Sequence, residues 1–304
     1  MQRYLCALCN HAFSSSRREV AGGKKNILED YIFHKQTYKE LLEKYEIGRK
    51  ELQCIVERFC LLPKVHTPRS IHLIVDATYF GTRKDGSVWC VLVARDPERK
   101  ENLVWMFAET ETTYGYVLLK EELEHLGYTI LSVTGDGFSG IRSAFHGIPF
   151  QMCHVHAERL VIQGTTRSPL TEAGQVLLAL VRTLHGHTNS HLFTERMKHF
   201  AERYRDFLNE KTIHPFTGDW SYTHDGVRSA FLSLFRLRKY LFTYEHNKNI
   251  SKTTNSLEGH FKHVKKYLGI HSGLTLKHQQ KILAVILQAS SVSPSKNILN
   301  ELWK

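Results

Sequence analysis

Two aspartates stand where an α/β protein would place a metal site. Asp76 lies inside the apolar run of residues 71–80, and Asp136 follows the apolar run of residues 129–134 in a Gly-Asp-Gly sequence. A carboxylate among aliphatic side chains is costly unless it is paired or binds a metal. Sites in open α/β sheets gather at the carboxyl ends of strands, so the two carboxylates converge if their strands are neighbours. A divalent cation would relieve their repulsion, and oxygen ligands with open positions suit Mg²⁺ or Mn²⁺.

Each of these acids, and a third on the last helix, also has an ordinary structural interpretation. Asp76 could face outward or lie at an edge, and Gly-Asp-Gly around Asp136 is a common turn sequence. Glu258 could be the third residue of a capping box led by Asn255. The arrangement favours chemistry, because an acid on the first strand, one after the fourth and one on the last helix match a known site design.

The elements that must position these acids predict an α/β fold. Three strands in a row indicate an antiparallel meander, with Asp85-Gly86 closing the first hairpin. Two further strands alternate with crossover helices, which indicates a sheet that is part antiparallel and part parallel. The expected strands are 71–80, 87–94, 103–108, 129–134 and 150–154, and the expected helices between them are 113–126 and 138–145. From residue 158 to 244 only helical spacing is found, and a final helix begins near Asn255.

A shorter unit precedes the sheet. Thr37 and Glu40 form a capping box that opens a helix over residues 38–45, and a basic amphipathic helix follows over 49–59 after a turn. This is a helix-turn-helix pattern, in which the side chains facing DNA would be Arg49, Lys50 and Gln53. A plain helical hairpin that packs on another part of the chain is the alternative.

Charge narrows the class of protein. The 304 residues carry a net charge of +11, and 42% of them are hydrophobic, so disorder is a poor interpretation. Residues 1–70 hold 13 basic and 8 acidic side chains, residues 71–235 hold 16 and 19, and residues 236–281 hold 10 and 2. Two basic arms therefore flank a slightly acidic middle, which favours a nucleic-acid partner. No apolar run approaches the roughly 18 residues of a membrane span, and the first residues do not form a signal peptide, so we expect a cytoplasmic, nucleoid-associated protein without membrane partners.

Four short motifs, in order, resemble those of DDE transposases, and specifically the Mutator-like group of bacterial insertion-sequence transposases. The motifs are IVDATYF at 74–80, TGDGFSG at 134–140, CHVHAER at 153–159 and TTNSLEGHFK at 253–262. The resemblance covers roughly residues 27–285. It implies an RNase H-like catalytic domain interrupted by an all-α insertion, with Asp76, Asp136 and Glu258 as the metal-binding catalytic triad.

The resemblance also implies a reaction. Two Mg²⁺ (or Mn²⁺) ions roughly 4 Å apart would clamp the attacking and leaving oxygens. Water would free a 3′-OH at the transposon end, and this 3′-OH would attack target DNA. The partners would be double-stranded DNA, as terminal inverted repeats and as target, and a second copy of the chain in a homodimer or larger assembly.

Cysteines and histidines raise two further questions. Cys153 and His156 match the Cys-x-x-His motif of the same family, and we expect them to support the architecture of the active site, with a buried thiol and a hydrogen-bonded imidazole as the alternative. Cys6 and Cys9 resemble the second knuckle of a zinc ribbon, whose other ligand pair would lie upstream. Three alternatives stay open. Either the chain is truncated upstream of Cys6, or His11 or another group takes the place of the missing ligands, or no Zn²⁺ binds. Without a secretory signal, the six cysteines are expected to be reduced.

Lysines follow the last acid along its helix. Lys262 and Lys265 stand four and seven residues after Glu258, and Lys266 is adjacent. Such a stripe beside a metal site is placed to hold the phosphates of the strand being cut, whereas a soluble surface with an ion pair is the alternative.

These observations predict a domain order and a function. The expected parts are a partial zinc-ribbon-like segment (1–24), a helix-turn-helix (25–64), the first part of the catalytic domain (70–157), an all-helical insertion (158–250), the last catalytic helices (251–290) and a tail (291–304). The predicted function is DNA transposition by metal-dependent cleavage and strand transfer. Two alternatives stay open, a non-enzymatic helix-turn-helix regulator and an RNase H-like nuclease that cuts without joining.

Overall fold

The computed structural model describes residues 3–5, 12–14, 23–59, 61–81, 88–186, 188–270 and 274–289. The chain divides into two compact units. The larger comprises residues 65–262, and the smaller comprises residues 1–64 together with 263–304. The division passes through one helix, α11 (Asn255–Ile270).

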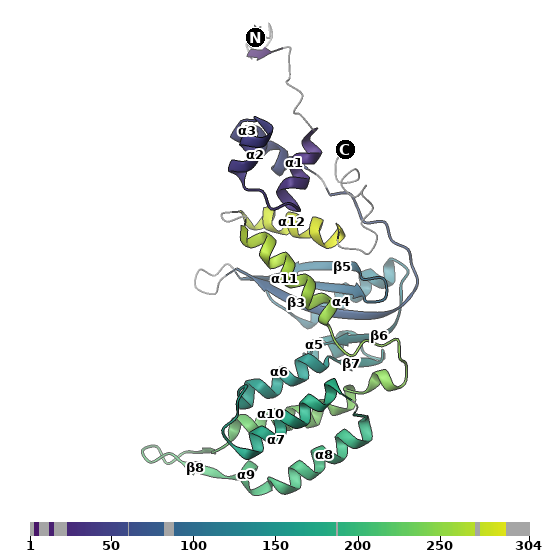
Figure 1. The fold of residues 1–304 in the computed structure, drawn as a ribbon. Coiled ribbons are helices and arrows are strands. Elements are labelled where there is room, and N and C mark those ends of the chain that lie inside the picture. The colour runs from purple at the N-terminus through teal and green to yellow at the C-terminus, as the bar shows by residue number, and fades with distance from the viewer. Residues whose placement is uncertain are drawn as a thin grey trace. The chain divides into compact units, whose positions relative to one another are not determined.

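A five-stranded mixed sheet forms one half of the larger unit (Figure 1). Its strands, in chain order, are β3 (Ser70–Phe80), β4 (Trp89–Asp96), β5 (Glu101–Ala108), β6 (Thr129–Gly135) and β7 (Phe150–Met152). The order across the sheet is β5-β4-β3-β6-β7, with β3, β4 and β5 antiparallel and β3, β6 and β7 parallel. An antiparallel meander followed by two parallel strands is the RNase H-like sheet, as the sequence predicted.

Two crossover helices connect the parallel strands, α4 (Thr113–His125) and α5 (Ser139–Ala144). Thr112 caps the first of them by accepting a hydrogen bond from the backbone N–H of Gly115 at 3.1 Å. Leu119 and Leu123 of α4 are fully buried in the same core as Leu92 of β4, because helical spacing brings one apolar face onto the sheet. The predicted hairpin turn at residues 83–86 lies outside the described residues.

The last strand is shorter than the sequence predicted. We expected it over 150–154, whereas β7 ends at Met152, Cys153 is the N-cap of the next helix, and His154 is its first residue. The backbone N–H of Cys153 still donates to the carbonyl of Gly135, at 2.7 Å. Cys153 keeps an extended backbone, so only from His154 onward does the chain adopt helical geometry, and the apolar run in the sequence does not mark this change.

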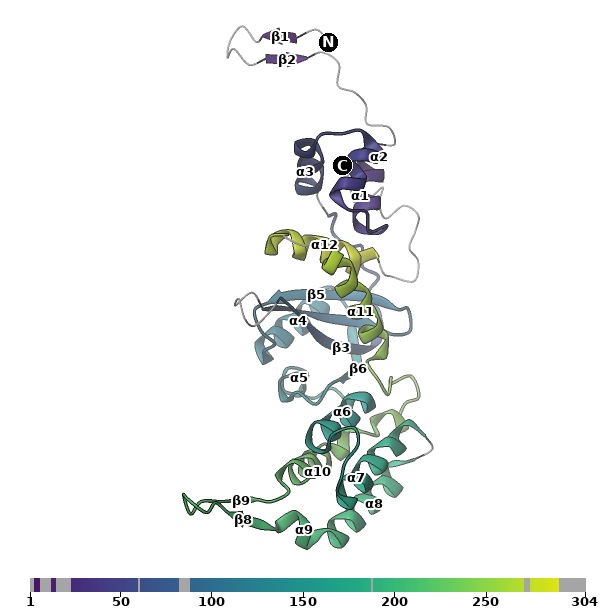
Figure 2. The same cartoon turned by 60° about the vertical axis from the view of Figure 1, so that its left-hand side comes forward.

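Helices form the other half of the larger unit (Figure 2). They are α6 (His154–Thr165), α7 (Glu172–Arg182), α8 (Ser190–Arg203), α9 (Arg205–Asn209) and α10 (Asp225–Leu237), with 3₁₀ turns at Thr183–His185, Arg238–Tyr240 and Thr243–Glu245. Gly164 of α6 and Gly226 of α10 let these two helices approach closely, since a Cβ on Gly164 would lie 2.3 Å from the carbonyl oxygen of Gly226.

One element of this block was not predicted. A short antiparallel hairpin, β8 (Lys211–Ile213) and β9 (Trp220–Tyr222), extends from between α9 and α10 (Figure 2). Each strand has three residues, too few to establish a strand period in the sequence. The insertion predicted as all-helical is therefore helical except for this hairpin.

The smaller unit holds the remaining elements. These are β1 (Arg3–Leu5) and β2 (Ala12–Ser14), which pair antiparallel, and α1 (Gly23–Ile32), α2 (Tyr38–Tyr45), α3 (Arg49–Arg58) and α12 (Leu276–Ala289). The capping box of Thr37 and Glu40 is present at the start of α2. The sequence did not predict α1, whose Asp30 accepts hydrogen bonds from Lys44 at 2.6 Å and from Tyr45 at 2.7 Å, both on α2.

The helix α12 packs with the N-terminal helices. Lys281 donates to the carbonyl of Glu57 at 2.8 Å, and Gln288 donates to the carbonyl of Leu62 at 3.1 Å. The sequence analysis grouped residues 251–290 with the catalytic domain, whereas the contacts group residues from 263 onward with the helices near the N-terminus.

Candidate active site

Strand register sets Asp76 and Asp136 at the same level of the sheet. The parallel pairing of β3 and β6 ends with Ile74 opposite Thr134. Asp76 lies two residues after Ile74, inside β3, and Asp136 lies two residues after Thr134, directly after β6. Asp136 accepts a hydrogen bond from the backbone N–H of Phe138 at 2.8 Å, which holds its carboxylate in the loop beyond the strand. The neighbouring strands expected from the sequence are therefore present.

Glu258 reaches this edge through the segment that precedes α11. The hydroxyl of Thr134 donates to the carbonyl of Ser251 at 2.9 Å, and the backbone N–H of His154 donates to the carbonyl of Lys252 at 3.0 Å. These bonds fix the segment to the end of β6 and to the start of α6. Glu258 lies in the first turn of α11 and donates its own N–H to the carbonyl of Thr254 at 3.1 Å.

Cys153 takes part in the same anchoring. Its sulfur, fully buried, accepts hydrogen bonds from the N–H and the hydroxyl of Thr254, at 3.3 and 3.5 Å. Thr254 is the residue before α11, so this thiol helps to fix where the helix begins. A buried, hydrogen-bonded thiol is also the alternative that the sequence left open, so the supporting role of Cys153 in the active site stays a prediction.

His156 lies among the acids. Asp76, His156 and Glu258 each offer a potential ligand atom, and these three atoms lie within 4.8 Å of one another. Asp136 is not a member of this group, although its charge acts on Asp76. The imidazole Nε2 of His156 is 3.7 Å from a carboxylate oxygen of Glu258, so this histidine faces the acids directly.

Arg159 is a site residue that the sequence analysis did not single out. One turn after His156 on α6, its two terminal nitrogens contact both carboxylate oxygens of Glu258, at 2.9 and 2.6 Å. The spacing of three residues from His156 was the signal available in the sequence, because it sets both side chains on one face of a helix.

Glu111 is a further acid near the site, which the sequence also did not indicate. It accepts a hydrogen bond from the hydroxyl of Tyr116 at 2.6 Å. Burial raises its pKa, the hydrogen bond from Tyr116 opposes the rise, and the charge of Asp136 adds to it. Glu111 follows β5 in a turn with no regular spacing to the other acids, so only the fold brings it close.

Burial and like charges act together on Asp76. Burial is the largest cause, and together with the charges of Asp136 and Glu258 it raises the pKa of Asp76 to about 7, against the lowering effects of His156 and of the Ala77 N–H. Among the described residues, the backbone N–H of Ala77, at 2.9 Å, is the only hydrogen-bond donor to this carboxylate. Asp76 is thus a buried acid with most of its acceptor capacity open.

The pKa of His156 is raised, whereas the pKa of Cys153 is lowered. Burial alone would lower the pKa of His156, but the hydrogen bond and charge of Cys153 and the charges of Asp76 and Asp136 raise it to about 9. Burial would raise the pKa of Cys153, yet its contacts with His156 and Thr254 lower it. An imidazolium that stays protonated at neutral pH supplies positive charge to the acids and has no lone pair for a metal.

The donor set fits a hard divalent cation. Asp76 of β3 and Glu258 of α11 offer carboxylate oxygens within 4.8 Å of each other, and the charge of Asp136 acts on Asp76. Carboxylate oxygens are the ligands that Mg²⁺ and Mn²⁺ prefer. The pKa of Asp76 is raised although His156 opposes the rise, because burial and the neighbouring acids outweigh it, and a divalent cation would stabilise the charged form. A pocket of about 260 Å³ opens beside the acids, lined among others by Asp136, His156 and Arg159. It leaves room for a substrate group next to the carboxylates.

The expected DNA-contacting side chains are exposed. Arg49, Lys50 and Gln53 lie on the outer face of α3, where Gln53 donates to Glu57 at 2.7 Å. Lys262, Lys265 and Lys266 are exposed on α11. Cys6, Cys9 and His11 lie outside the described residues.

In the described part of the chain, no helix combines the length and the apolar character needed to cross a bilayer.

Comparisons with known proteins give no family by sequence. No protein-family model matches, and no curated protein matches significantly. Among solved structures, the chain is similar to one in the Drosophila P element transposase strand transfer complex, with 11% identity, 94% of each chain covered and a TM-score of 0.43. It is also similar to one in a simian T-cell lymphotropic virus intasome with PP2A regulatory subunit B56 gamma, with 13% identity, 68% of this chain and 72% of that chain covered and a TM-score of 0.24. Both overlaps are loose, so the fold assignment rests on strand order and register.

Proposed function

We propose that this chain is a DDE transposase that cuts DNA at transposon ends and joins the resulting 3′-OH to target DNA. The observation that carries the proposal is the closeness of acids from distant segments. Ligand atoms of Asp76 and Glu258 lie within 4.8 Å of each other, and the charge of Asp136, which follows the neighbouring strand, acts on Asp76. A stable fold alone would not select this arrangement, because a buried carboxylate beside two further acids costs free energy.

The proposed chemistry is phosphoryl transfer at these carboxylates. Bound divalent cations, two in the mechanism we favour, would supply Lewis-acid activation of the attacking water or 3′-OH and of the leaving oxygen. Asp76, held in a strand and closed off from solvent, would provide a rigid oxygen ligand. Glu258 would provide a second from a helix that the Thr254 contacts fix in place.

Glu258 must exchange partners for this role. Its carboxylate is held by Arg159 and faces His156, so ligand binding requires the guanidinium to move. Half of the Arg159 side chain is exposed, which leaves the guanidinium free to turn toward the pocket beside Asp136. A guanidinium there would pair with a phosphate of the strand being cut, because its planar donors match phosphate geometry.

The DNA contacts that we assign are two exposed basic surfaces. Arg49, Lys50 and Gln53 at the start of α3 would bind the terminal inverted repeats as a helix-turn-helix, and the lysines of α11 would bind phosphates near the cut. The four sequence motifs support membership of the Mutator-like insertion-sequence group. An assembly of two or more copies on paired ends follows from the same resemblance.

A strand-transfer assay with the full chain tests the proposal. The substrates are the DNA ends that flank the gene, supplied with Mg²⁺ or Mn²⁺ and a target plasmid. Asp76→Ala, Asp136→Ala and Glu258→Ala should each abolish cleavage and joining while leaving duplex binding in place. Glu121→Ala, an exposed acid of α4, is the matched control and should retain activity.

Three results would contradict parts of the proposal. Joining by the three alanine variants at the parent's rate would remove the site assignment. Activity unchanged in EDTA would remove the metal. Cleavage without joined product would assign an RNase H-like nuclease instead, and sequence-specific DNA binding without any cleavage would assign a regulator.

A further inference from the structure

The β8–β9 hairpin exposes three large apolar side chains to solvent. Phe216 at its tip is 92% exposed, Ile213 is 67% exposed and Trp220 is 55% exposed. Both views show the hairpin extending away from α7 and α8, out from the helical block (Figures 1 and 2). Exposed apolar side chains gathered at one place mark sites of interaction, so this tip is a candidate contact for a partner.

The charges of the hairpin argue against DNA as that partner. Between residues 211 and 222 it has one lysine or arginine, Lys211, one histidine, His214, and one acidic side chain, Asp219. The ammonium of Lys211 lies 3.7 Å from the ring centre of Trp220 and is therefore turned onto the hairpin. In the described residues no cation pairs with the exposed carboxylate of Asp219. A neutral surface whose open charge is negative is poorly suited to phosphates.

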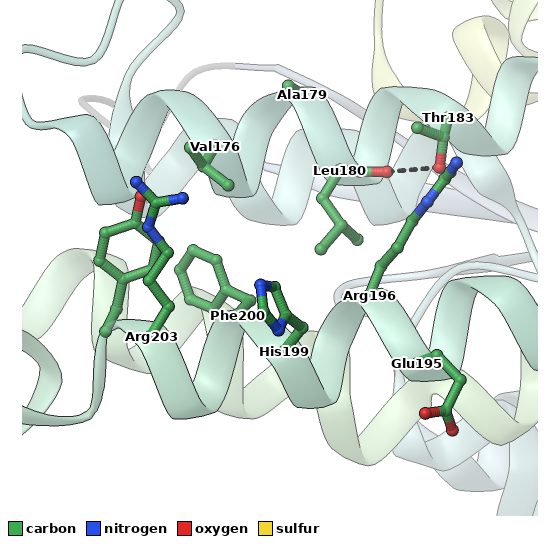
Figure 3. A pocket seen from close by; sticks show the side chains of 10 residues that line it. Val176, Ala179, Leu180, Thr183, Glu195, Arg196, His199, Phe200 and Arg203 are labelled. Carbon is green, nitrogen blue, oxygen red and sulfur yellow. Dashed lines mark hydrogen bonds between the residues drawn. The ribbon is translucent and has the colours of Figure 1, made fainter.

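A complementary surface lies on the same unit. A pocket of about 500 Å³ opens between α7 and α8 (Figure 3), and Val176, Leu180 and Phe200 provide its apolar floor. Arg203 and Arg196 stand at its two ends. The volume is in the range of sites that enclose an aromatic group together with its neighbours.

The rim of this pocket is positive. Arg203 is paired with Glu172 at 2.7 Å, whereas Arg196 has no ion-pair partner among the residues that the structure describes. The one acid at the rim, Glu195, is paired with Lys198 at 2.8 Å. The pocket therefore combines an apolar floor with one uncompensated guanidinium, and the hairpin tip combines an apolar ring with one uncompensated carboxylate.

We propose that the hairpin of one copy docks into the α7–α8 pocket of a second copy. Phe216 fills the pocket, and the carboxylate of Asp219 pairs with the guanidinium of Arg196. A two-fold axis allows each copy to give one hairpin and to receive one, so that two equal contacts close a dimer. A Phe side chain buries about 150–250 Å² in such a contact, which makes the ring the main source of affinity and the ion pair a source of orientation. This interface is independent of the proposed transposase activity.

The test is the dissociation constant of the full chain, measured by sedimentation equilibrium without DNA. We expect a dimer that Phe216→Asp weakens at least tenfold, since a fully exposed ring can be replaced without unfolding the monomer. Leu170→Asp is the matched control. It removes a leucine that is 97% exposed and does not line the pocket, and it should leave the dimer intact.

A charge exchange distinguishes this specific contact from nonspecific hydrophobic association. Asp219→Arg and Arg196→Asp should each weaken the dimer, and the double variant should recover most of the loss, because it restores the pair with opposite polarity. Circular dichroism of each variant verifies folding.

Several outcomes would overturn the proposal. The wild-type chain could stay monomeric, or Phe216→Asp could dimerise like the parent. The double variant of Asp219→Arg and Arg196→Asp could also fail to restore the dimer that each single variant weakens. A Phe216→Asp variant that keeps its dimer but loses DNA affinity would instead identify the hairpin as a DNA contact.

Discussion

Arg159 holds Glu258 in a bidentate ion pair, with its two terminal nitrogens at 2.9 and 2.6 Å from the two carboxylate oxygens. The pair joins α6 to α11 across the candidate active site. It places a positive charge beside Glu258, whose carboxylate raises the pKa of Asp76. The same pair occupies the oxygens that a metal would need, so Arg159 and a divalent cation compete for one carboxylate.

Removal of Arg159 should therefore strengthen metal binding. We expect Arg159→Ala to bind Mn²⁺ about two- to fivefold more tightly than the parent, since a half-exposed ion pair contributes on the order of 0.2–1 kcal/mol. The measurement is isothermal titration calorimetry on the full chain without DNA. DNA cleavage should fall in the same variant, because the guanidinium is also the proposed phosphate contact.

Arg182 offers a matched control for this experiment. Its pair with Glu158, at 2.9 Å, has nearly the same exposure as the pair of Arg159, with 51% of each arginine side chain exposed. Arg182→Ala should leave the affinity for Mn²⁺ unchanged. Equal affinities of Arg159→Ala and the parent for Mn²⁺ would show that Arg159 and the metal do not compete for Glu258.

Asp76→Asn should make the metal-free protein more stable. It removes a buried charge that Asp136 and Glu258 oppose, and the gain should be about 0.5–2 kcal/mol, as is typical when a strained functional group is relaxed. Mg²⁺ should raise the melting temperature of the parent but not that of this variant. Differential scanning fluorimetry with and without Mg²⁺ measures both effects, with Glu121→Gln as the control. A lower melting temperature for metal-free Asp76→Asn would contradict the electrostatic account.

Gly164→Ala should destabilise the helical block. The new Cβ would meet the carbonyl oxygen of Gly226 at 2.3 Å and the Cβ of Ala230 at 2.8 Å, so α6 and α10 must separate. We expect a loss of about 1–3 kcal/mol in urea unfolding. Gly259→Ala in α11 meets nothing within 4 Å and should instead gain about 0.5–1 kcal/mol from helix propensity. If both variants shift in the same direction, the close approach of the two helices is not as described.

Asp30 should make the N-terminal helices sensitive to acid. Burial alone would raise its pKa, but the hydrogen bonds from His34, Lys44 and Tyr45 outweigh burial and lower it below its ordinary value of 3.8. The unfolded chain therefore binds this proton more readily than the folded one. The stabilisation is complete above pH 3.8 and is lost as the pH falls from there through the lower folded value.

Hydrogen exchange on the peptides of α1 and α2 measures this effect. At neutral pH, Asp30→Asn should lower their protection by about 1.5–3 kcal/mol, the contribution of hydrogen bonds to a charged acceptor. The variant should also lose the acid-dependent part of the parent's profile. Glu43→Gln, an exposed acid of α2, is the control. Parent-like protection in Asp30→Asn would show that this carboxylate does not join the two helices.

The sequence by itself determined the features that depend on local pattern. Apolar runs bounded by turn residues predicted the five strands of the sheet, and the mixed order that they adopt was confirmed. The capping box of Thr37 and Glu40 was also confirmed. Its two partners are three residues apart, so a local sequence pattern is enough to predict it. The positions of Asp76 within a strand and of Asp136 directly after one followed from the same apolar runs.

Only the tertiary structure decided which side chains meet. Arg159 and Glu258 are far apart in sequence, as are Cys153 and Thr254, and no local pattern connects them. The hairpin around Phe216 has strands too short to show a period, and α12 joins the N-terminal helices through contacts that follow no spacing rule. Strand and helix formation are governed by neighbours along the chain, whereas the charge balance of the site is set by burial and by groups that only the fold brings within a few ångströms.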